Sequence, residues 1–334
     1  MTVRFALLGA GRIGKVHARA IAADPHATLV AIADAAAEAA SALAGSTGAA
    51  VRSIDEIAIS ADVDAVLICT PTDTHADLIE LFARAGKAIF CEKPIDLALA
   101  RVKACLAVVA ETGAPLMLGF NRRFDPDFRA VKAAIDRGDV GTVEMVTIVS
   151  RDPGPPPIEY IGRSGGIFRD MTIHDFDMAR WLLDEEPETV FAAASVLTDP
   201  AIGKAGDYDS VNVVLRTASG RQAIITNTRR AAYGYDQRIE VLGSLGAVAA
   251  ENTHQANIQI ATKAGYVKPP LLDFFMTRYV AAYAAEIAAF VAALVDRTPM
   301  PVGGRDGLAA LALAEAALKS VAEGRAVRVA EIVG

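Results

Sequence analysis

Asp170 and His174 are the side chains whose types and spacing most directly suggest acid–base chemistry. They stand four residues apart where a helical pattern of apolar residues begins, at Ile173 and Phe176, so both should project from one face of its first turn. A histidine with a carboxylate one turn away is suited to removing a proton near neutral pH. Aspartate is also a favoured N-cap, so Asp170 could simply begin the helix, with His174 a surface residue. The pair alone leaves both interpretations open.

A second chemical signal is the glycine-rich run Gly9-Ala-Gly-Arg-Ile-Gly14, which follows a strand-like apolar run and opens a helical pattern. The first glycine permits a tight turn, the second lets the backbone approach a pyrophosphate, and the third lets the helix pack against the strand. The helix N-terminus then offers N–H groups and a positive dipole to the phosphates. The residues expected to bind a dinucleotide here are Gly9, Gly11, Arg12, Ile13 and Gly14.

Asp34 indicates which of the two nicotinamide dinucleotides, NAD or NADP, this site should bind. It falls 20 residues after Gly14, at the end of the second strand pattern. A carboxylate there can accept hydrogen bonds from the adenosine ribose and would repel a 2′-phosphate. Ala35 and Ala36 follow, so no adjacent arginine is present to bind that phosphate. The sequence therefore predicts NAD over NADP.

Two later strand ends add polar side chains, because ligands of open α/β sheets lie beyond the carboxyl ends of the strands. The run 65–69 leads into Thr70-Pro-Thr-Asp-Thr-His75, and the run 88–91 leads into Glu92-Lys-Pro94. The first loop could line the cofactor groove or cap the helix from Thr74. Lys93 could reach a substrate hydroxyl beside the nicotinamide, although a lysine after a strand is most often solvated. The residues of these loops expected at the cofactor are Thr70, Pro71, Thr72, His75, Glu92 and Lys93.

The elements that position these residues change in kind near residue 120. Before it, apolar runs alternate with helical patterns, which is typical of a parallel sheet covered on both faces. The expected strands are 3–8, 28–33, 64–69, 87–91 and 115–119, with helices near 13–23, 36–44, 74–85 and 96–112. We expect an α/β fold whose N-terminal part, 1–120, is an NAD-binding Rossmann domain with a doubly wound parallel sheet.

After residue 120 the runs are longer and partly alternating, which suits a mostly antiparallel sheet. The expected strands are 142–150, 188–197, 210–217, 221–228, 237–243 and 256–262, with a turn at Ser219-Gly220 and helices at about 274–296 and 305–323. Residues 121–334 should form an α+β domain, to which the family resemblance described below assigns a large open sheet, substrate binding and oligomerisation. The helix at about 305–323 could pack back on the first domain.

Composition narrows the classes of partner and location. The 334 residues carry a formal charge of −7 without a basic tract, which argues against nucleic acid. The longest apolar stretch, 279–295, is interrupted by Glu286 and reads as a packed helix, not a membrane span. No signal peptide is recognisable, and the three cysteines form no close pair and no metal-ligand spacing, which favours buried thiols in the cytoplasm. No metal site is expected.

With these motifs, nearly the whole chain resembles the Gfo/Idh/MocA family of nicotinamide-dependent sugar oxidoreductases. The glycine loop 9–14, the Glu92-Lys-Pro94 motif and the Asp170–His174 pair carry the resemblance. Three longer segments, 119–125, 165–180 and 233–238, make the chain most similar to family members that oxidise inositols.

The resemblance implies a Rossmann domain followed by an open-sheet domain that often makes dimer or tetramer contacts. It implies a catalytic triad of Lys93, Asp170 and His174, and a cis peptide bond before Pro94 that would aim Lys93 into the cleft. The residues that the resemblance places at the substrate are Lys93, Asn121, Arg123, Asp152, Asp170, His174 and either Tyr233 or Tyr235.

The implied reaction is oxidation of a secondary alcohol of a cyclic polyol, best fitted by myo-inositol going to 2-keto-myo-inositol. His174 would be the general base, Asp170 would orient it, and Lys93 would donate to the reacting oxygen, with NAD taking the hydride. Alternatives are scyllo-inositol, chiro-inositol, D-glucose or another aldose as substrate, an NAD-dependent glycosidase, and a non-catalytic sugar sensor. The intact triad argues against the sensor. We expect a cytoplasmic homo-oligomer, a dimer or a tetramer.

Overall fold

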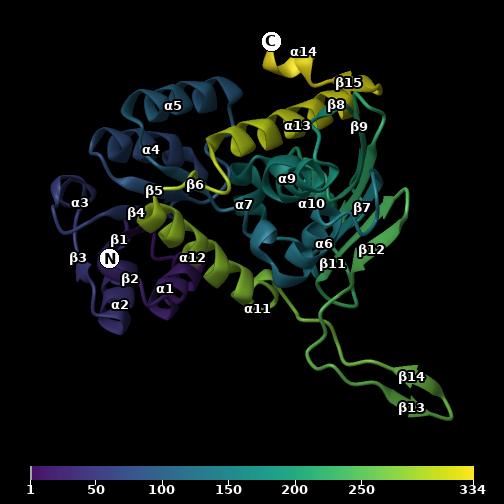
Figure 1. Cartoon of the computed structure of the whole chain (residues 1–334), viewed down its shortest axis with the longest axis horizontal. Coiled ribbons are helices and arrows are strands. Elements are labelled where there is room, and N and C mark those ends of the chain that lie inside the picture. Colours follow the sequence, from purple (N-terminus) through teal and green to yellow (C-terminus); the bar gives the residue numbers. More distant parts are fainter. Residues whose placement is uncertain (1) are drawn as a thin grey trace. The chain divides into compact units, whose positions relative to one another are not determined.

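The computed structural model describes residues 2–334, which form two compact units. The first comprises Met1–Asp125 and Val280–Ala309, and the second comprises Pro126–Tyr279 and Ala310–Gly334. Figure 1 labels the elements of both. Each unit is therefore discontinuous in sequence, which a division into 1–120 and 121–334 does not anticipate.

The first unit is built on a parallel sheet of the Rossmann type. Its six strands have the order β3-β2-β1-β4-β5-β6, and every neighbouring pair is parallel. The strands are β1 (Val3–Leu8), β2 (Ala27–Ala33), β3 (Ala50–Val51), β4 (Ala65–Ile68), β5 (Ala88–Cys91) and β6 (Leu116–Leu118). The five expected strands are confirmed: β4, β5 and β6 are fully buried apolar runs and β1 is nearly so, whereas β2 is buried only over its last three residues. The two-residue β3 is exposed and leaves no such signal.

Helices cover both faces of this sheet. They are α1 (Arg12–Ala23), α2 (Ala37–Thr47), α3 (Ile54–Ile59), α4 (His75–Arg84), α5 (Leu99–Thr112), α12 (Val280–Asp296) and the first residues of α13 (Gly304–Glu323). α4 packs on α5 and α1 packs on α12, and Figure 1 shows these two pairs on opposite sides of the sheet. Phe290 of α12 contacts the rings of Phe5 and Phe90 on the strands. The late helix α12 therefore completes this core.

The second unit contains a seven-stranded sheet with the order β12-β11-β7-β10-β9-β8-β15. Its strands are β7 (Val143–Arg151), β8 (Pro187–Ser195), β9 (Ser210–Thr217), β10 (Gln222–Thr228), β11 (Asp236–Gly243), β12 (Gly246–Ala250) and β15 (Val327–Arg328). Among the strand pairs described for this sheet, the β7–β10 pair is parallel and the other five are antiparallel. The expected mostly antiparallel sheet is confirmed.

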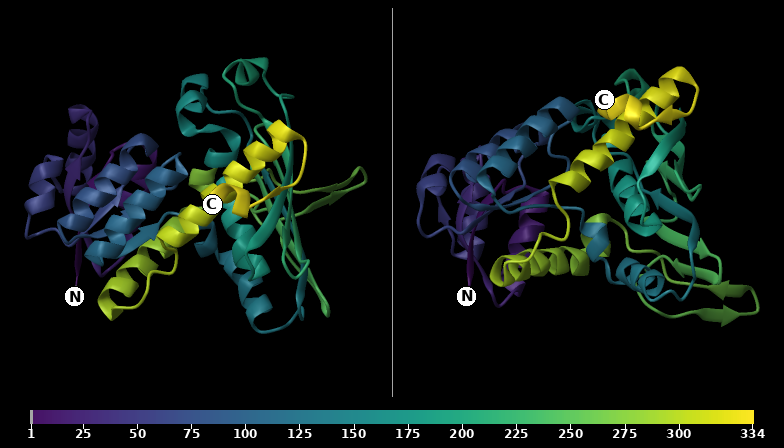
Figure 2. Two further views of the ribbon diagram at one scale, coloured as in Figure 1. Left: turned by 90° about the horizontal axis from the view of Figure 1, so that it is seen from above. Right: turned by 45° about the horizontal axis from the view of Figure 1, so that its top comes forward.

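The expected strand at 256–262 is wrong except at its end. β13 (Ile260–Thr262) pairs with β14 (Gly265–Val267) in a separate hairpin, which extends away from the large sheet in both views of Figure 2. The side chains of β13 are exposed. Alternation here reflects the pleat of an isolated ribbon and not a buried face.

The helices of the second unit lie mainly on one face of its sheet. They are α6 (Pro126–Asp136), α7 (Ile158–Ser164), α8 (Gly166–Asp170), α9 (Thr172–Leu183), α10 (Pro200–Lys204), α11 (Phe275–Arg278), most of α13 and α14 (Ala330–Val333). α9 packs across β7 and β10. The helix expected at about 274–296 is interrupted at Tyr279. Across residues 2–334, no helix combines the length and the apolarity needed to cross a membrane.

Candidate active site

The glycine loop of the first unit has the local geometry that a bound pyrophosphate requires. Gly9 has a φ of +96°, and a Cβ there would lie 2.6 Å from the Cys69 carbonyl oxygen. A Cβ on Gly14 would lie 2.0 Å from the Gly9 carbonyl oxygen, so the helix can pack this closely only on glycine. A Cβ on Gly11 would meet no atom of residues 2–334 within 4 Å. Gly11 therefore borders the open space that a ligand could fill.

Helix α1 begins at this loop with an N-terminus suited to an anion. Gly11 is its N-cap, and among the described residues no side chain caps it and no acidic residue lies in its first turn. Its first N–H groups and its dipole therefore remain available to a phosphate.

Asp34 lies directly beside the glycine loop, at the end of β2. Its two carboxylate oxygens accept the backbone N–H groups of Ala10, at 2.6 Å, and of Ala36, at 2.7 Å. The side chain is half-buried, so one edge of the carboxylate is accessible. This position suits a partner for ribose hydroxyls.

The loop between β4 and α4 is organised by its own hydroxyls. The Thr70 and Thr74 Oγ1 atoms lie 2.7 Å apart, and Thr74 donates to the Pro71 carbonyl oxygen at 2.7 Å. The Thr74 side chain does not cap α4, so that alternative is wrong. Thr70 and Thr72 are half-buried and Pro71 is exposed at the carboxyl edge of the sheet. Their contact with the cofactor stays a prediction.

His75 is placed behind this loop instead of on its surface. The side chain is 2% exposed, and its Nδ1 lies 2.7 Å from the Pro94 carbonyl oxygen. Its Nε2 lies 2.8 Å from the Thr70 carbonyl oxygen. His75 therefore joins the two loops expected at the cofactor, and it would act on the cofactor through them.

The motif Glu92-Lys93-Pro94 follows β5, and the Lys93–Pro94 peptide bond is cis, as the resemblance implies. The Glu92 Oε1 lies 2.6 Å from the His17 Nε2. A Cβ on Gly119 would lie 3.1 Å from the Glu92 carboxyl carbon, so this carboxylate also packs against the β6 end. Glu92 is thus held by the protein on two sides.

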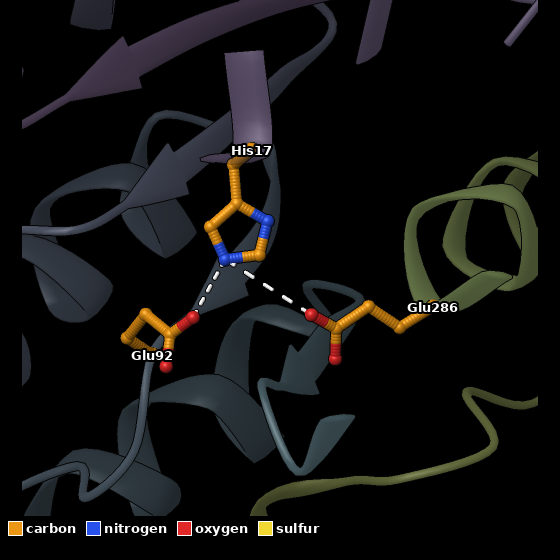
Figure 3. A group of neighbouring side chains, drawn as sticks. All are labelled: His17, Glu92 and Glu286. Atoms are coloured by element: carbon orange, nitrogen blue, oxygen red, sulfur yellow. Dashed lines mark hydrogen bonds and ion pairs between the residues drawn. The ribbon is translucent and has the colours of Figure 1, made fainter. Parts of the chain in front are cut away.

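Glu286 of α12 joins this pair in a buried cluster that the motifs do not reveal (Figure 3). Its side chain is 0% exposed, and its Oε1 lies 4.0 Å from the His17 Nε2. Burial, together with the nearby charge of Glu92, raises the pKa of Glu286 well above its ordinary value. The available signal is a single acidic residue inside an otherwise apolar helix. We define the His17 cluster as His17, Glu92 and Glu286.

Two further expected substrate residues of the first unit, Asn121 and Arg123, lie in the 3₁₀ turn Asn121–Phe124. Asn121 is buried. The Arg123 guanidinium forms an ion pair with Asp306, with 2.9 Å between Nη2 and Oδ1. An aspartate that orients an arginine is compatible with polyol binding by that arginine, which stays a prediction.

In the second unit, Asp170 does not stand in the first turn of the helix that carries His174. Asp170 ends the short helix α8, and α9 begins at Thr172 after Met171 as N-cap. The capping alternative for Asp170 is therefore wrong as well, since the N-cap of α9 is Met171 and not Asp170. His174 is half-buried in the first turn of α9.

Asp170 has two partners that the sequence does not suggest. Tyr160 donates its hydroxyl to Asp170 Oδ1 at 2.9 Å, and the Arg229 guanidinium lies 3.8 Å from Oδ2. Arg229 is buried and also lies 3.3 Å from Asp207. Burial raises the pKa of Asp207. Arg229 thus faces two carboxyl groups, and it balances the charge of Asp170.

Asp175, next to His174 in sequence, anchors α9 to the sheet. Its Oδ1 accepts the Ser150 hydroxyl at 2.6 Å, and its Oδ2 accepts the Asn227 amide at 2.8 Å. All three residues are buried. Ser150 lies on β7 and Asn227 on β10, so the first turn of α9 is fixed to two neighbouring strands.

The remaining expected substrate residues lie near the same strand ends. The Asp152 N–H donates to the Thr228 carbonyl at 2.9 Å and so continues the β7–β10 pairing. Tyr233 is 52% exposed, and its hydroxyl accepts from Arg151 at 2.9 Å and donates to Asp236. Burial and the hydrogen bond to Asp236 raise the pKa of Tyr233.

Tyr235, the alternative to Tyr233, is buried. Its ring packs edge-on against Phe274 and Tyr279, with centroids 6.3 and 6.0 Å apart. Tyr233 is therefore the more accessible of the two tyrosines.

Comparisons with known proteins give one family model for the N-terminal part of the chain and another for the part that follows it. Residues 3–120 match the family model described as oxidoreductase family, NAD-binding Rossmann fold. Residues 128–249 match the model of the GFO/IDH/MocA C-terminal domain.

Three similar proteins cover essentially the whole chain. An inositol 2-dehydrogenase of Rhizobium meliloti is 68% identical over 99% of this chain and 100% of its own length. A solved myo-inositol dehydrogenase of Corynebacterium glutamicum has a TM-score of 0.95 and 43% identity, covering 98% of this chain and 99% of that one. A solved scyllo-inositol dehydrogenase of Lactobacillus casei, with bound NAD(H) and scyllo-inositol, has a TM-score of 0.92 and 29% identity, covering 99% and 100%.

Proposed function

Because this chain belongs to the Gfo/Idh/MocA family of oxidoreductases, we propose that it oxidises myo-inositol to 2-keto-myo-inositol with NAD as hydride acceptor. The observation that carries the proposal is the 68% identity, over 99% of the chain, to an inositol 2-dehydrogenase. The alternative of an NAD-dependent glycosidase has no comparable support.

The residues present fit NAD. The open space at Gly11 and the uncapped start of α1 suit the pyrophosphate, and Asp34 suits the adenosine ribose. Gly9, Gly14 and the loop after β4 would complete the site. When bound, NAD supplies the acceptor for the hydride.

In the proposed mechanism the chain's own groups move the proton and stabilise the reacting oxygen. His174 accepts the proton of the hydroxyl that is oxidised. Asp170, held by Tyr160 and charge-balanced by Arg229, favours the protonated form of His174. Lys93 donates to the oxygen as it gains alkoxide character. Asn121, Arg123, Asp152 and Tyr233 would hold the other hydroxyls.

We further propose that residues 121–334 bind the substrate and mediate a homo-oligomer, in the cytoplasm. Phe191, Val214 and Ile224 lie side by side on the outer face of β8, β9 and β10 and are 44%, 39% and 39% exposed. Adjacent exposed apolar side chains of this kind are typical of protein–protein contacts. The three free, buried cysteines suit a reducing compartment.

The decisive experiment measures initial rates of NADH or NADPH formation with myo-, scyllo- and chiro-inositol and D-glucose. We expect the highest kcat/KM with myo-inositol and NAD. Scyllo-inositol is the second candidate, because a solved relative binds it. Absence of activity on every inositol would contradict the substrate, and sugar release from a glycoside without net NADH would favour the glycosidase.

A further inference from the structure

The loop that carries Lys93 is anchored on both sides by a buried histidine. On one side His17 holds the Glu92 side chain, with 2.6 Å between Nε2 and Oε1. On the other side His75 holds the Pro94 carbonyl oxygen, 2.7 Å from its Nδ1. Both imidazoles are buried, so water competes little for these hydrogen bonds. The backbone of Lys93 therefore runs between two fixed points.

The His75 anchor also links this loop to the end of β4. Its second nitrogen lies 2.8 Å from the Thr70 carbonyl oxygen. Each ring nitrogen thus lies within hydrogen-bond distance of a carbonyl oxygen, one on each loop. The His75 ring therefore bridges the loops after β4 and β5, which both belong to the proposed NAD site.

The His17 anchor is enforced by close packing. The Glu92 N–H donates to the Ile68 carbonyl at 3.0 Å, and the Gly119 N–H donates to the Cys91 carbonyl at 2.8 Å. These bonds bring the Gly119 backbone against the Glu92 carboxylate, where a Cβ would be 3.1 Å from the carboxyl carbon. Since His17 closes the other side, the Glu92 side chain has little freedom to adopt another rotamer.

The three donor groups of the His17 cluster lie within 4.8 Å of one another, which raises the question of a metal ion. The geometry favours instead a proton shared between His17 and Glu92. The N–O distance of 2.6 Å is that of a hydrogen bond. Two ligands of one zinc ion, each at about 2.0–2.2 Å in tetrahedral geometry, lie roughly 3.3–3.6 Å apart.

The surrounding groups supply no further charge that would demand a metal. Burial raises the pKa of the Cys69 and Cys91 thiols, which keeps them neutral, and the Tyr283 ring packs edge-on against His17 at 5.4 Å. Burial also raises the pKa of Glu286, which favours its neutral form beside His17. The short hydrogen bond of the cluster is the one between His17 and Glu92, since Glu286 Oε1 lies farther away, 4.0 Å from His17 Nε2.

We propose that His17 and His75 are positioning residues for the oxidation reaction, because they fix the backbone from which Lys93 reaches the reacting hydroxyl. This inference rests on the proposed function, in which Lys93 contacts the substrate. His17 acts through the Glu92-Lys93-Pro94 motif alone, whereas His75 also contacts the Thr70 carbonyl oxygen of the loop after β4.

The test compares His17→Phe and His75→Phe with the wild type. Phenylalanine keeps a ring at each site, where His17 packs on Phe90 and Tyr283, but removes both nitrogens. We expect kcat to fall by about 10- to 100-fold, since small displacements of a reacting group have effects of this size. The KM for the polyol in both variants, and the Kd for NAD in His17→Phe, should change by less than about 3-fold, which corresponds to about 0.7 kcal/mol. His17→Gln, which retains a donor, should restore part of kcat.

Lys93→Met then separates positioning from general destabilisation. If His17 and His75 act through Lys93, each histidine variant should lower kcat little further in the Lys93→Met background, measured by single turnover. A full multiplicative loss in the double variants would overturn the inference. The exposed His26 provides the matched control, since His26→Phe should leave kcat unchanged.

The possible failures are distinguishable. If Lys93→Met keeps full turnover, the proposed role of Lys93 is wrong. If Lys93→Met loses turnover while folded His17→Phe and His75→Phe keep it, only the positioning inference is wrong. Elemental analysis that finds one transition-metal ion per chain, absent from Glu286→Gln, would overturn the shared-proton cluster and with it the His17 anchor.

Discussion

The Asp34 carboxylate accepts the Ala10 backbone N–H across 2.6 Å, so one side chain both ties β2 to the glycine loop and faces the proposed ribose position. Asp34→Asn removes the charge but keeps the shape. We expect kcat/KM for NAD to fall by about 10- to 100-fold, the effect of a hydrogen bond to a charged group worth about 1.5–3 kcal/mol. The NADP/NAD ratio of kcat/KM should rise. An unchanged ratio would remove Asp34 from cofactor selection, and the exposed Asp55→Asn is the control.

His174→Asn should lower kcat by about 10²–10⁴-fold, because general base catalysis contributes that much. The NAD Kd, from nicotinamide or protein fluorescence, should stay near that of the wild type. The pH dependence of kcat/KM should lose its acidic limb in the variant. Equal turnover in His174→Asn would assign the base to another group, and His26→Asn controls for loss of a surface histidine.

Asp175→Ala should destabilise the protein by about 2–4 kcal/mol, because it leaves the buried hydroxyl of Ser150 and amide of Asn227 without their shared acceptor. Urea unfolding measures this change. Ser150→Ala, which removes one of the two bonds, should cost about half as much. Asp136→Ala, at an exposed ion pair with Lys132, should change stability by less than about 0.5 kcal/mol. Equal effects of the buried and exposed variants would contradict the anchoring of α9.

Glu286→Gln should stabilise the protein increasingly as the pH rises. The pKa of Glu286 is raised in the folded state from an ordinary value of 4.5. The folded state then binds the Glu286 proton more tightly than the unfolded state does, so the stability of the wild type is unaffected below about pH 4.5 and falls as the pH rises through the folded pKa. Glutamine cannot titrate, and the difference in Tm between variant and wild type should grow from pH 4 to pH 8. A pH-independent difference would show that Glu286 is ionised in the fold.

Val214→Asp tests the proposed oligomer. Val214 lies between Phe191 and Ile224 on the open face of the sheet, so a charge there should dissociate a contact made by this face. Size-exclusion chromatography with light scattering should then report a smaller species than for the wild type. Val51→Asp, at an exposed apolar residue of the first unit, is the control. An unchanged mass would place the contact elsewhere.

The sequence predicts those parts of the fold and of the candidate site whose pattern lies within one short segment of the chain. The continuous apolar runs of β1, β4 and β5 and the spacing of Gly9 and Gly14 are local patterns, and the structure confirms them. The break between α8 and α9 is not visible, because Met171 continues the apolar pattern through the junction. The apolar pattern alone therefore assigns Asp170 to the helix of His174, α9, whereas it is the last residue of α8.

The contacts missed in the candidate site join residues that are far apart in the chain. Glu286 lies near His17 because α12, late in the chain, packs in the first unit. Arg229 lies near Asp170 because the fold of the second unit brings the end of β10 next to the end of α8. Periodicity describes one element at a time and carries no information on such meetings. An acidic or basic residue at a buried position is the one local trace that they leave.

The discontinuity of the first unit also has a consequence during synthesis. Its core requires Phe290 and Glu286, which follow β6 only after residues 126–279 have been translated. At about 5–20 residues per second, the ribosome takes on the order of 10 s to make that segment. For this interval the nascent Rossmann unit exposes Phe5 and Phe90, which its own last helix will later cover. The polypeptide should therefore fold as one post-translational event, and chaperones that hold nascent chains have a defined apolar surface to bind.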